Sequence, residues 1–222
     1  GEMLPNALVA DIPTRFPGFS PKNFDFTYSG AVPASKALSQ SLNIPAVKML
    51  QTYSAEKFLG LLRKAGFSGF RNDAGHYGLS LILGGGEASL WELTGVYASL
   101  SRTLNHFTDE GKYWLGDYHP PVLAAENENK PEKKEDPDPP LKASAIWLTY
   151  DALLKVNRPE SEAGWQYFSS SRDFAWKTGT SFGFRDAWAV GTTPEYVIGV
   201  WAGNADGEGR PGLTGISAAA PV

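Results

Sequence analysis

Between Ala34 and Leu100, and again over 143–156, several segments carry apolar residues at every third or fourth position, which is the spacing of amphipathic helices. The helical pattern that starts at Ala34 is interrupted by Pro45, which has no amide hydrogen and disfavours helix at the residue before it. One helix is therefore expected to stop near Ser41, and a second to begin with Pro45 in its first turn. Residues 41–43 are then expected at a helix-to-helix turn.

Three further helices are predicted downstream. The segment 55–65 has an apolar face, with Ser54 as its expected N-cap and Gly66 as its expected stop. A helix over 87–100 follows three glycines, and another covers 143–156. Helices are therefore expected to dominate the chain before its last third.

The last third favours strands. Segments 173–180, 185–193 and 196–204 are rich in Trp, Val, Tyr, Phe or Thr, and a short turn at 193–195 favours antiparallel pairing of the last two. The opening stretch, 1–33, is dense in proline, glycine and aromatics, and is expected to be irregular with at most one short strand. Helices first and strands late predict an α/β (α+β) fold, an antiparallel sheet covered by helices.

Composition narrows the class of protein. With 222 residues and 42% hydrophobic content, the chain is expected to form a single domain over 1–222. Residues 124–142 are almost wholly Glu, Lys, Asp, Asn and Pro, and are expected to form a disordered surface loop. The net charge of -4 comes from interspersed charges, so no nucleic-acid partner is expected.

Several kinds of site lack the residues they need. Without a run of roughly 20 apolar residues, this chain is expected to contain no membrane span. Because it has no cysteine, disulfides, thiolate metal sites and cysteine nucleophiles are excluded. His76, His106 and His119 lack metal-ligand spacing and are expected in loops or on the surface, so no metal site is expected.

The sequence Lys177-Thr178-Gly179-Thr180 is the strongest chemical signal. On a strand, Lys177 and Gly179 point to one face, and Thr178 and Thr180 point to the other. Glycine weakens a strand unless a ligand or another backbone approaches closely, and a lysine with flanking hydroxyls can hold a carboxylate. The alternative is a surface strand with a solvated lysine and a glycine bulge.

Two motifs in order indicate a family. Ser41-Leu42-Asn43 precedes Lys177-Thr178-Gly179, and this order resembles that of penicillin-binding transpeptidases and serine β-lactamases. The chain is most similar to bifunctional class A (1C-type) penicillin-binding proteins, and the likeness includes 11–13, 83–87 and 211–215. The resemblance implies their transpeptidase fold, incomplete at both ends of this chain.

The family's Ser-x-x-Lys motif carries the nucleophilic serine and the lysine that accepts its proton. The only match here is Ser54-Ala55-Glu56-Lys57, which follows Ser-x-Asn instead of preceding it and is already explained by a helix cap. The nucleophile is therefore expected upstream of Gly1, which makes the chain a truncated fragment that is inactive alone. A nicked domain whose other piece is missing is the open alternative.

The resemblance implies catalytic roles for four residues. Ser41 would relay a proton to the leaving amine, and Asn43 would bond the substrate backbone and the catalytic lysine. Lys177 would supply positive potential for substrate binding and proton transfer. The Thr180 amide would form the oxyanion hole together with the amide of the nucleophilic serine.

The resemblance also implies the substrate-binding residues. Thr178 and Thr180 would hold the terminal carboxylate of the substrate, with Gly179 allowing close approach to the strand. No cofactor and no metal are implied.

The function implied is peptidoglycan DD-transpeptidation through an acyl-serine, which cross-links stem peptides and is inhibited by β-lactam antibiotics. The expected location is extracytoplasmic, at the periplasmic face of the cytoplasmic membrane, in a membrane-anchored parent protein. Two alternatives stay open. Water instead of an amine could take the acyl group, as in a DD-carboxypeptidase or β-lactamase, or the domain could be a catalytically silent sensor that binds β-lactams or peptidoglycan.

Overall fold

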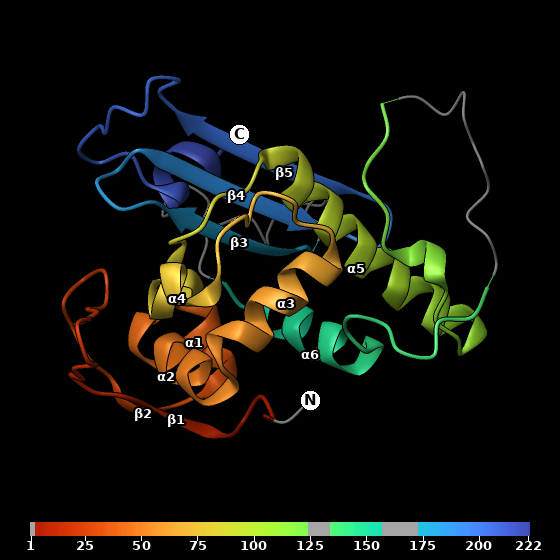
Figure 1. Ribbon diagram of the computed structural model, residues 1–222, viewed down its shortest axis with the longest axis horizontal. Coiled ribbons are helices and arrows are strands. Elements are labelled where there is room, and N and C mark those ends of the chain that lie inside the picture. The colour runs from red at the N-terminus through yellow and green to blue at the C-terminus, as the bar shows by residue number, and fades with distance from the viewer. Residues whose placement is uncertain (1–2, 124–133, 157–172) are drawn as a thin grey trace. The chain divides into compact units, whose positions relative to one another are not determined.

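The computed structural model describes residues 3–123, 134–156 and 173–222 (Figure 1). These residues fall into two compact units, which comprise residues 1–88 and 89–222. The expectation of a single domain over 1–222 stays a prediction. No helix within the described ranges has both the length and the hydropathy that a membrane crossing requires.

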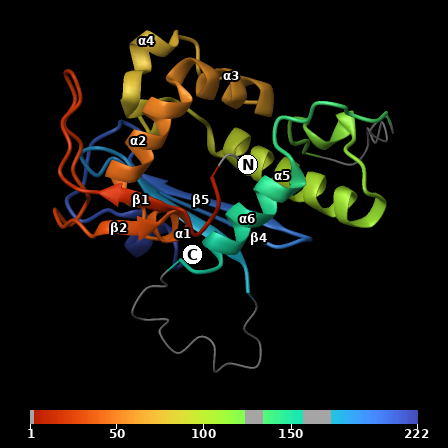
Figure 2. The same ribbon diagram turned by 90° about the horizontal axis from the view of Figure 1, so that it is seen from below.

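The first unit combines a two-stranded sheet with short helices. Its elements are β1 (Leu8–Asp11), β2 (Gly30–Pro33), α1 (Ala34–Ser39), α2 (Asn43–Tyr53), α3 (Ala55–Ala65), α4 (Ala74–Tyr77) and the 3-10 helix η1 (Gly78–Leu83). The antiparallel strands β1 and β2 lie side by side (Figure 2). Two paired strands thus replace the single short strand expected before residue 33. These strands escaped prediction because each has only four residues, too few to establish an alternating pattern.

Helix α3 confirms the prediction for 55–65. The Ser54 hydroxyl accepts a hydrogen bond from the Lys57 amide, and Gly66 ends the helix in a left-handed conformation with φ of 114°. The boundary signals were local here, so the sequence was sufficient to place both ends.

The second unit is a three-stranded antiparallel sheet with helical cover. Its elements are α5 (Leu90–Glu110), the 3-10 helix η2 (Leu115–Asp117), α6 (Ala143–Leu153), β3 (Ala175–Thr180), β4 (Asp186–Thr192), β5 (Val197–Gly203) and the π-helix η6 (Gly215–Ala219). The strand order is β3-β4-β5, with both pairs antiparallel (Figure 1). The predicted strands and the predicted hairpin between the last two are confirmed.

Helix α5 starts later and ends much later than the predicted 87–100. Its start is fixed by a capping box, in which Ser89 and Glu92 bond each other's backbone amides. The sequence did not predict the part of α5 after residue 100, because its buried face includes polar residues such as Ser99 and Thr103. Each hydroxyl donates to the carbonyl four residues earlier, so a polar sequence here forms a buried helix face.

The polar segment 124–142 lies partly outside the described residues, which resume at Lys134. The carbonyl of Lys134 accepts a hydrogen bond of 2.9 Å from the Leu115 amide, and the Asp136 amide donates to the Tyr113 carbonyl at 2.8 Å. Glu135 also forms a β-bridge with Trp114. Residues 134–136 are thus paired through their backbone although their sequence has no apolar periodicity, and the expectation of a disordered surface loop over 124–142 stays a prediction.

The two faces of the sheet have different cover. Thr178 lies opposite Ala189, and Ala189 packs against Ala219 of η6. The opposite face includes Lys177 and Gly199; a β-carbon added at Gly199 would collide with side chains of α5. Helix α6 contacts β3, and α5 contacts β5. The motif strand is thus held between two layers.

Gly215 allows a close approach between η6 and the motif strand. A β-carbon at this position would lie 2.5 Å from the carbonyl oxygens of both Gly179 and Trp188, and 2.9 Å from the β-carbon of Thr178. Only glycine therefore lets η6 begin directly against the motif strand.

We expect Gly215→Ala to lower the free energy of unfolding by about 1 to 3 kcal/mol, because η6 must move away from two backbone carbonyls. Thermal and urea unfolding measure this change. The matched control is Gly60→Ala in α3, where the added β-carbon meets nothing within 4 Å. It should stabilise the chain by about 0.5 to 1 kcal/mol. Equal stabilities of both variants would contradict the packing argument.

Candidate active site

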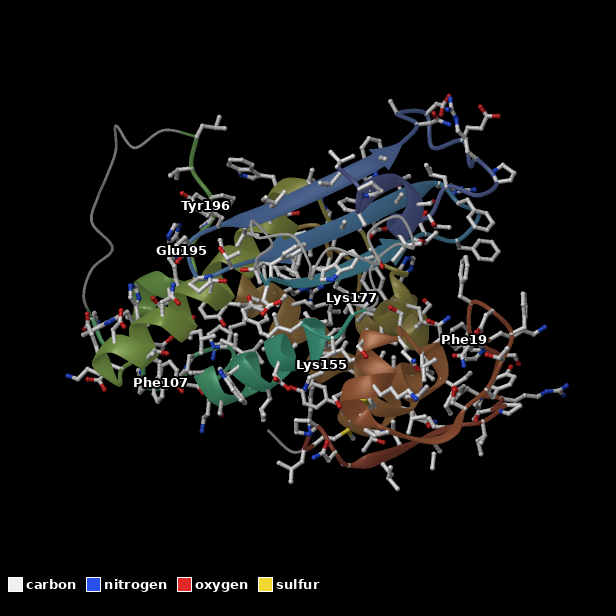
Figure 3. All side chains as sticks on the ribbon, turned by 180° about the vertical axis from the view of Figure 1, so that it is seen from behind. Phe19, Phe107, Lys155, Lys177, Glu195 and Tyr196 are labelled. Atoms are coloured by element: carbon white, nitrogen blue, oxygen red, sulfur yellow. The ribbon has the colours of Figure 1, made fainter. Side chains whose placement is uncertain are left out.

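The structure confirms the alternation predicted for the motif strand. Lys177 lies on β3 (Figure 3), on the face that α5 and α6 cover. Thr178 and Thr180 lie on the η6 face, where the Thr180 hydroxyl accepts a hydrogen bond of 3.0 Å from the Gly215 amide. A hydroxyl that accepts one bond can still donate its hydrogen, so Thr180 retains the donor that a carboxylate needs.

Two residues of β3 direct their backbone N–H and C=O groups away from β4. The Ser181 amide donates to the Asp186 carbonyl at 3.0 Å, which makes this opposed pair a hydrogen-bonded one. Because bonded and non-bonded pairs alternate in an antiparallel ladder, the amides and carbonyls of Thr178 and Thr180 point away from β4. In the described sheet β3 is an edge strand, so these groups face the side of β3 that is opposite β4.

Lys177 is a half-buried ammonium. Its Nζ donates to the Thr178 carbonyl at 2.9 Å, at the edge of the sheet. Burial lowers the pKa of Lys177 below its ordinary value because desolvation disfavours the charged form. The alternative of a fully solvated surface lysine does not describe this position, and an ammonium with a lowered pKa suits proton transfer.

Ser41 occupies a position that usually belongs to glycine. Its amide donates to the Leu38 carbonyl and the Leu42 amide donates to the Ala37 carbonyl, which is the pair of hydrogen bonds of a Schellman motif at the end of α1. Ser41 has φ of 55°, the left-handed conformation that this motif requires. An exposed serine is thus held in a strained backbone at the predicted turn.

Asn43 is the first residue of α2, and Pro45 lies in the first turn as predicted. The Asn43 side-chain Nδ2 donates to the Lys22 carbonyl at 2.8 Å. This bond orients the amide so that Oδ1 points the other way, available as an acceptor for an ammonium or an amide. The local geometry therefore fits the role that the resemblance implies for Asn43.

A buried polar pair beside this turn was missed by the sequence reasoning. Asp11 is 0% exposed and Asn23 is 3% exposed, and Asn23 Nδ2 donates to Asp11 Oδ1 at 2.8 Å. Asn23 Oδ1 in turn accepts from the Asn43 amide at 2.9 Å. The only signal in the sequence was the likeness at 11–13, which says nothing about burial.

Ser54 keeps the role of a helix cap. Its hydroxyl accepts from the Lys57 amide and donates to Glu56 Oε2 at 2.7 Å. The bond from Ser54 lowers the pKa of Glu56. Both polar functions of the hydroxyl are thus committed to the helix end, which supports the interpretation of Ser54-Ala55-Glu56-Lys57 as a chance match.

The histidines differ from expectation at one position. His106 lies on α5, and its Nδ1 is 2.6 Å from Oδ1 of Asp117, a carboxylate that is 1% exposed. Asp117 Oδ2 also accepts from the Trp114 amide. His106 was expected in a loop or on the surface; its side chain is 38% exposed but lies on a helix and is paired, because the chain folds back eleven residues later to supply the carboxylate. This pair ties η2 to α5.

Two groups of site residues emerge. Ser41 and Asn43 belong to the first unit, and Lys177 to Thr180 belong to the second. Each group has a local geometry suited to its implied role, and their assembly into one site stays a prediction. Within the described residues, no three His, Asp or Glu side chains gather as metal ligands would.

The conformation of Ser41 leads to a stability prediction. A left-handed backbone costs an L-residue about 1 to 2 kcal/mol, partly offset in glycine by the greater freedom of its unfolded chain. We expect Ser41→Gly to raise the free energy of unfolding by about 0.5 to 1 kcal/mol, as measured by urea unfolding. Ser41→Ala keeps the β-carbon and should give no such gain. A gain from alanine equal to that from glycine would exclude backbone strain as the cause.

The pKa of Lys177 leads to a second prediction. A lowered folded-state pKa means that the charged form destabilises the fold at neutral pH, and that this penalty fades as pH rises through the folded pKa toward the ordinary value. Lys177→Met should therefore unfold at a higher temperature than the unmodified chain at pH 7, and the difference should narrow at alkaline pH. Lys155→Met, at an exposed lysine in the turn after α6 that is paired with Asp151, is the surface control.

No family model matches the chain. By sequence it is 32% identical over 222 residues to penicillin-binding protein 1C of Escherichia coli, which covers 100% of this chain and 26% of that protein. It is 27% identical to penicillin-binding protein 1F of Bacillus subtilis, over 90% of this chain and 27% of the relative. The chain thus spans about a quarter of the length of these curated relatives.

Solved structures share the fold. The PonA1 protein of Mycobacterium tuberculosis in complex with penicillin V superposes with a TM-score of 0.70 at 19% identity, over 97% of this chain and 60% of that one. Penicillin-binding protein 1A of Haemophilus influenzae gives 0.65 at 21% identity, over 96% and 37%. Together with the sequence likeness to class A penicillin-binding proteins, these matches show that the chain has the fold of a penicillin-binding transpeptidase domain.

Proposed function

We propose that this chain supplies the carboxylate-binding strand and the proton-relay turn of a serine-type DD-transpeptidase that cross-links peptidoglycan stem peptides. The observation that carries the proposal is the edge position of β3 in the sheet that the structure describes. There the Thr178 and Thr180 backbone groups face outward beside a half-buried Lys177. An extended peptide can add to such an edge as a further strand, which matches the shape of a stem peptide.

The reaction begins with the nucleophilic serine of a Ser-x-x-Lys motif, supplied by residues outside this chain. Its oxygen attacks the carbonyl carbon of the donor peptide while its proton passes to the lysine of the same motif, and the outward amide of Thr180 stabilises the oxyanion that forms. Removal of one such donor typically slows catalysis by about 100- to 1000-fold. The bond from the carbonyl carbon to the leaving nitrogen then breaks, and Ser41 passes a proton to that nitrogen.

The second half of the reaction transfers the acyl group. An amine of another stem peptide attacks the ester, its proton leaves through the same relay, and the serine oxygen is released with a proton. Lys177 contributes positive potential near the substrate carboxylate, which Thr178 and Thr180 bind through their hydroxyls. In a β-lactam the leaving nitrogen stays tethered to the acyl group, so the ester persists and the enzyme is inhibited.

The strained backbone of Ser41 favours an enzyme over a silent sensor domain. A left-handed serine lowers stability at a position where glycine would suffice for the turn. A domain without chemistry would gain stability from glycine there.

The proposed location follows from the substrate. Because peptidoglycan lies outside the cytoplasm, we propose that the activity lies at the periplasmic face of the cytoplasmic membrane, in a membrane-anchored parent protein.

Intact-protein mass spectrometry after incubation with benzylpenicillin tests the proposal. We expect a covalent adduct on a chain extended upstream to include Ser-x-x-Lys, and none on residues 1–222 alone. In the extended chain, Ser41→Ala should slow adduct formation by about 100-fold or more. Ser54→Ala is the matched control for the cap serine and should form the adduct at the unmodified rate.

Other outcomes would change the assignment. An adduct on residues 1–222 that disappears in Ser54→Ala would make Ser54 the nucleophile. Absence of any adduct on the extended chain would favour a binding domain over an enzyme.

A further inference from the structure

We infer that Asp11 and Asn23 are positioning residues, which act through backbone hydrogen bonds to set the geometry of the Ser41–Asn43 turn. The inference rests on the proposed function. Neither residue belongs to the two motifs of the family resemblance. Both are buried polar residues, 0% and 3% exposed, and every polar contact described below lies within the first unit.

The start of α2 lacks a cap of its own. The N-cap residue is Leu42, which has no side-chain oxygen, and no side-chain cap bond forms there. Four amide donors at a helix start have no partner within the helix. The Leu42 amide bonds the Ala37 carbonyl, and Pro45 has no amide hydrogen. Two donors, those of Asn43 and Ile44, therefore need an acceptor from elsewhere.

Asn23 supplies that acceptor from twenty residues earlier in the chain. Its Oδ1 accepts from the Asn43 amide at 2.9 Å and, in a longer contact of 3.5 Å, from the Ile44 amide. Every backbone donor in the first turn of α2 is thereby accounted for. A cap supplied from a distant segment can fix where the helix starts as well as stabilise it.

Asp11 fixes which way the Asn23 amide points. Asn23 Nδ2 donates to Asp11 Oδ1 and to the Thr27 carbonyl, both at 2.8 Å, so its oxygen can only face α2. The second oxygen of Asp11 accepts from the Ser29 amide at 2.8 Å. Asp11 is the last residue of β1, so the β1–β2 hairpin is joined to the start of α2 through one side-chain amide.

These hydrogen bonds set the positions of the two motif residues, Ser41 and Asn43. The backbone of Asn43 is held by Asn23, and its side chain is held by the Lys22 carbonyl next to Asn23. Ser41, two residues earlier, is fixed on its other side by the end of α1. The orientations of the relay hydroxyl and of Asn43 Oδ1 therefore depend on where Asn23 sits, and displacements of about 1 Å are known to cost up to about 100-fold in rate.

A swap of the two side chains isolates this role. Asp11→Asn places an amide donor against either Asn23 Nδ2 or the Ser29 amide, and Asn23→Asp places two carboxylates together. In the double variant Asp11→Asn/Asn23→Asp, the new amide donates to the new carboxylate, which still accepts from the Asn43 amide. The bond to the Thr27 carbonyl is lost, and a carboxylate oxygen faces that carbonyl instead, so the swap restores the arrangement only in part.

The test measures the rate constant and the final extent of acylation by benzylpenicillin in the full-length protein. We expect each single variant to acylate about 10- to 100-fold more slowly with an unchanged final extent, and the double variant to recover part of the lost rate. A purely structural role would lower the final extent, because less protein is folded, and leave the rate constant of the folded part unchanged. Ser54→Ala, which removes the cap of the neighbouring α3, is the matched control and should leave the rate constant unchanged.

The outcomes separate this inference from the proposed function. If the unmodified protein acylates and the single variants show its rate constant, or the double variant shows no recovery, the positioning role is wrong. If the unmodified full-length protein does not acylate, the proposed function is overturned and the positioning role falls with it.

Discussion

The requirement that every buried backbone N–H and C=O find a partner governs the candidate site more than any single packing contact. Between α1 and α2 the chain turns within three residues, and the helix ends there must be satisfied locally or from a distance. The end of α1 is satisfied by twisting Ser41 into a left-handed conformation, and the start of α2 is satisfied by Asn23. The hydrogen bonds that satisfy these two helix ends therefore also set the positions of Ser41 and Asn43.

The same constraint acts in the opposite sense at the motif strand. Pairing with β4 satisfies alternate residues of β3, which leaves the amides and carbonyls of Thr178 and Thr180 directed to the edge. Unpaired backbone groups at a sheet edge can pair with another copy of the chain and cause aggregation, but in a peptide-binding domain they can bind an extended peptide. The motif thus combines a backbone that recognises an extended chain with side chains that recognise charge.

The close approach of η6 connects packing to this chemistry. Gly215 admits the helix to within van der Waals contact of the strand, and its amide then bonds the Thr180 hydroxyl. On the other face, the cover of α5 and α6 contributes to the burial that lowers the pKa of Lys177. Packing on both faces of the sheet therefore positions the polar groups at the edge of β3. The half-buried ammonium of Lys177 lowers the stability of the fold in return.

The sequence by itself determined the features that depend on neighbouring residues. It placed α3 between Ser54 and Gly66, the strand alternation at Lys177–Thr180 and the turn at Ser41, because caps, period and proline act over a few residues. It also indicated the family through the order of two motifs. Interactions of this kind join residues that are close in sequence, so they can be predicted without knowledge of the fold.

Only the tertiary structure decided the interactions between distant segments. The cap of α2 by Asn23, the pairing of His106 with Asp117 and the pairing of 134–136 with 113–115 each join residues whose types alone do not specify a partner. A buried polar group can be satisfied by any donor or acceptor that the fold brings near. Which one does so depends on how the elements pack, and for that reason the residues that hold the Ser-x-Asn turn in place were invisible in the sequence.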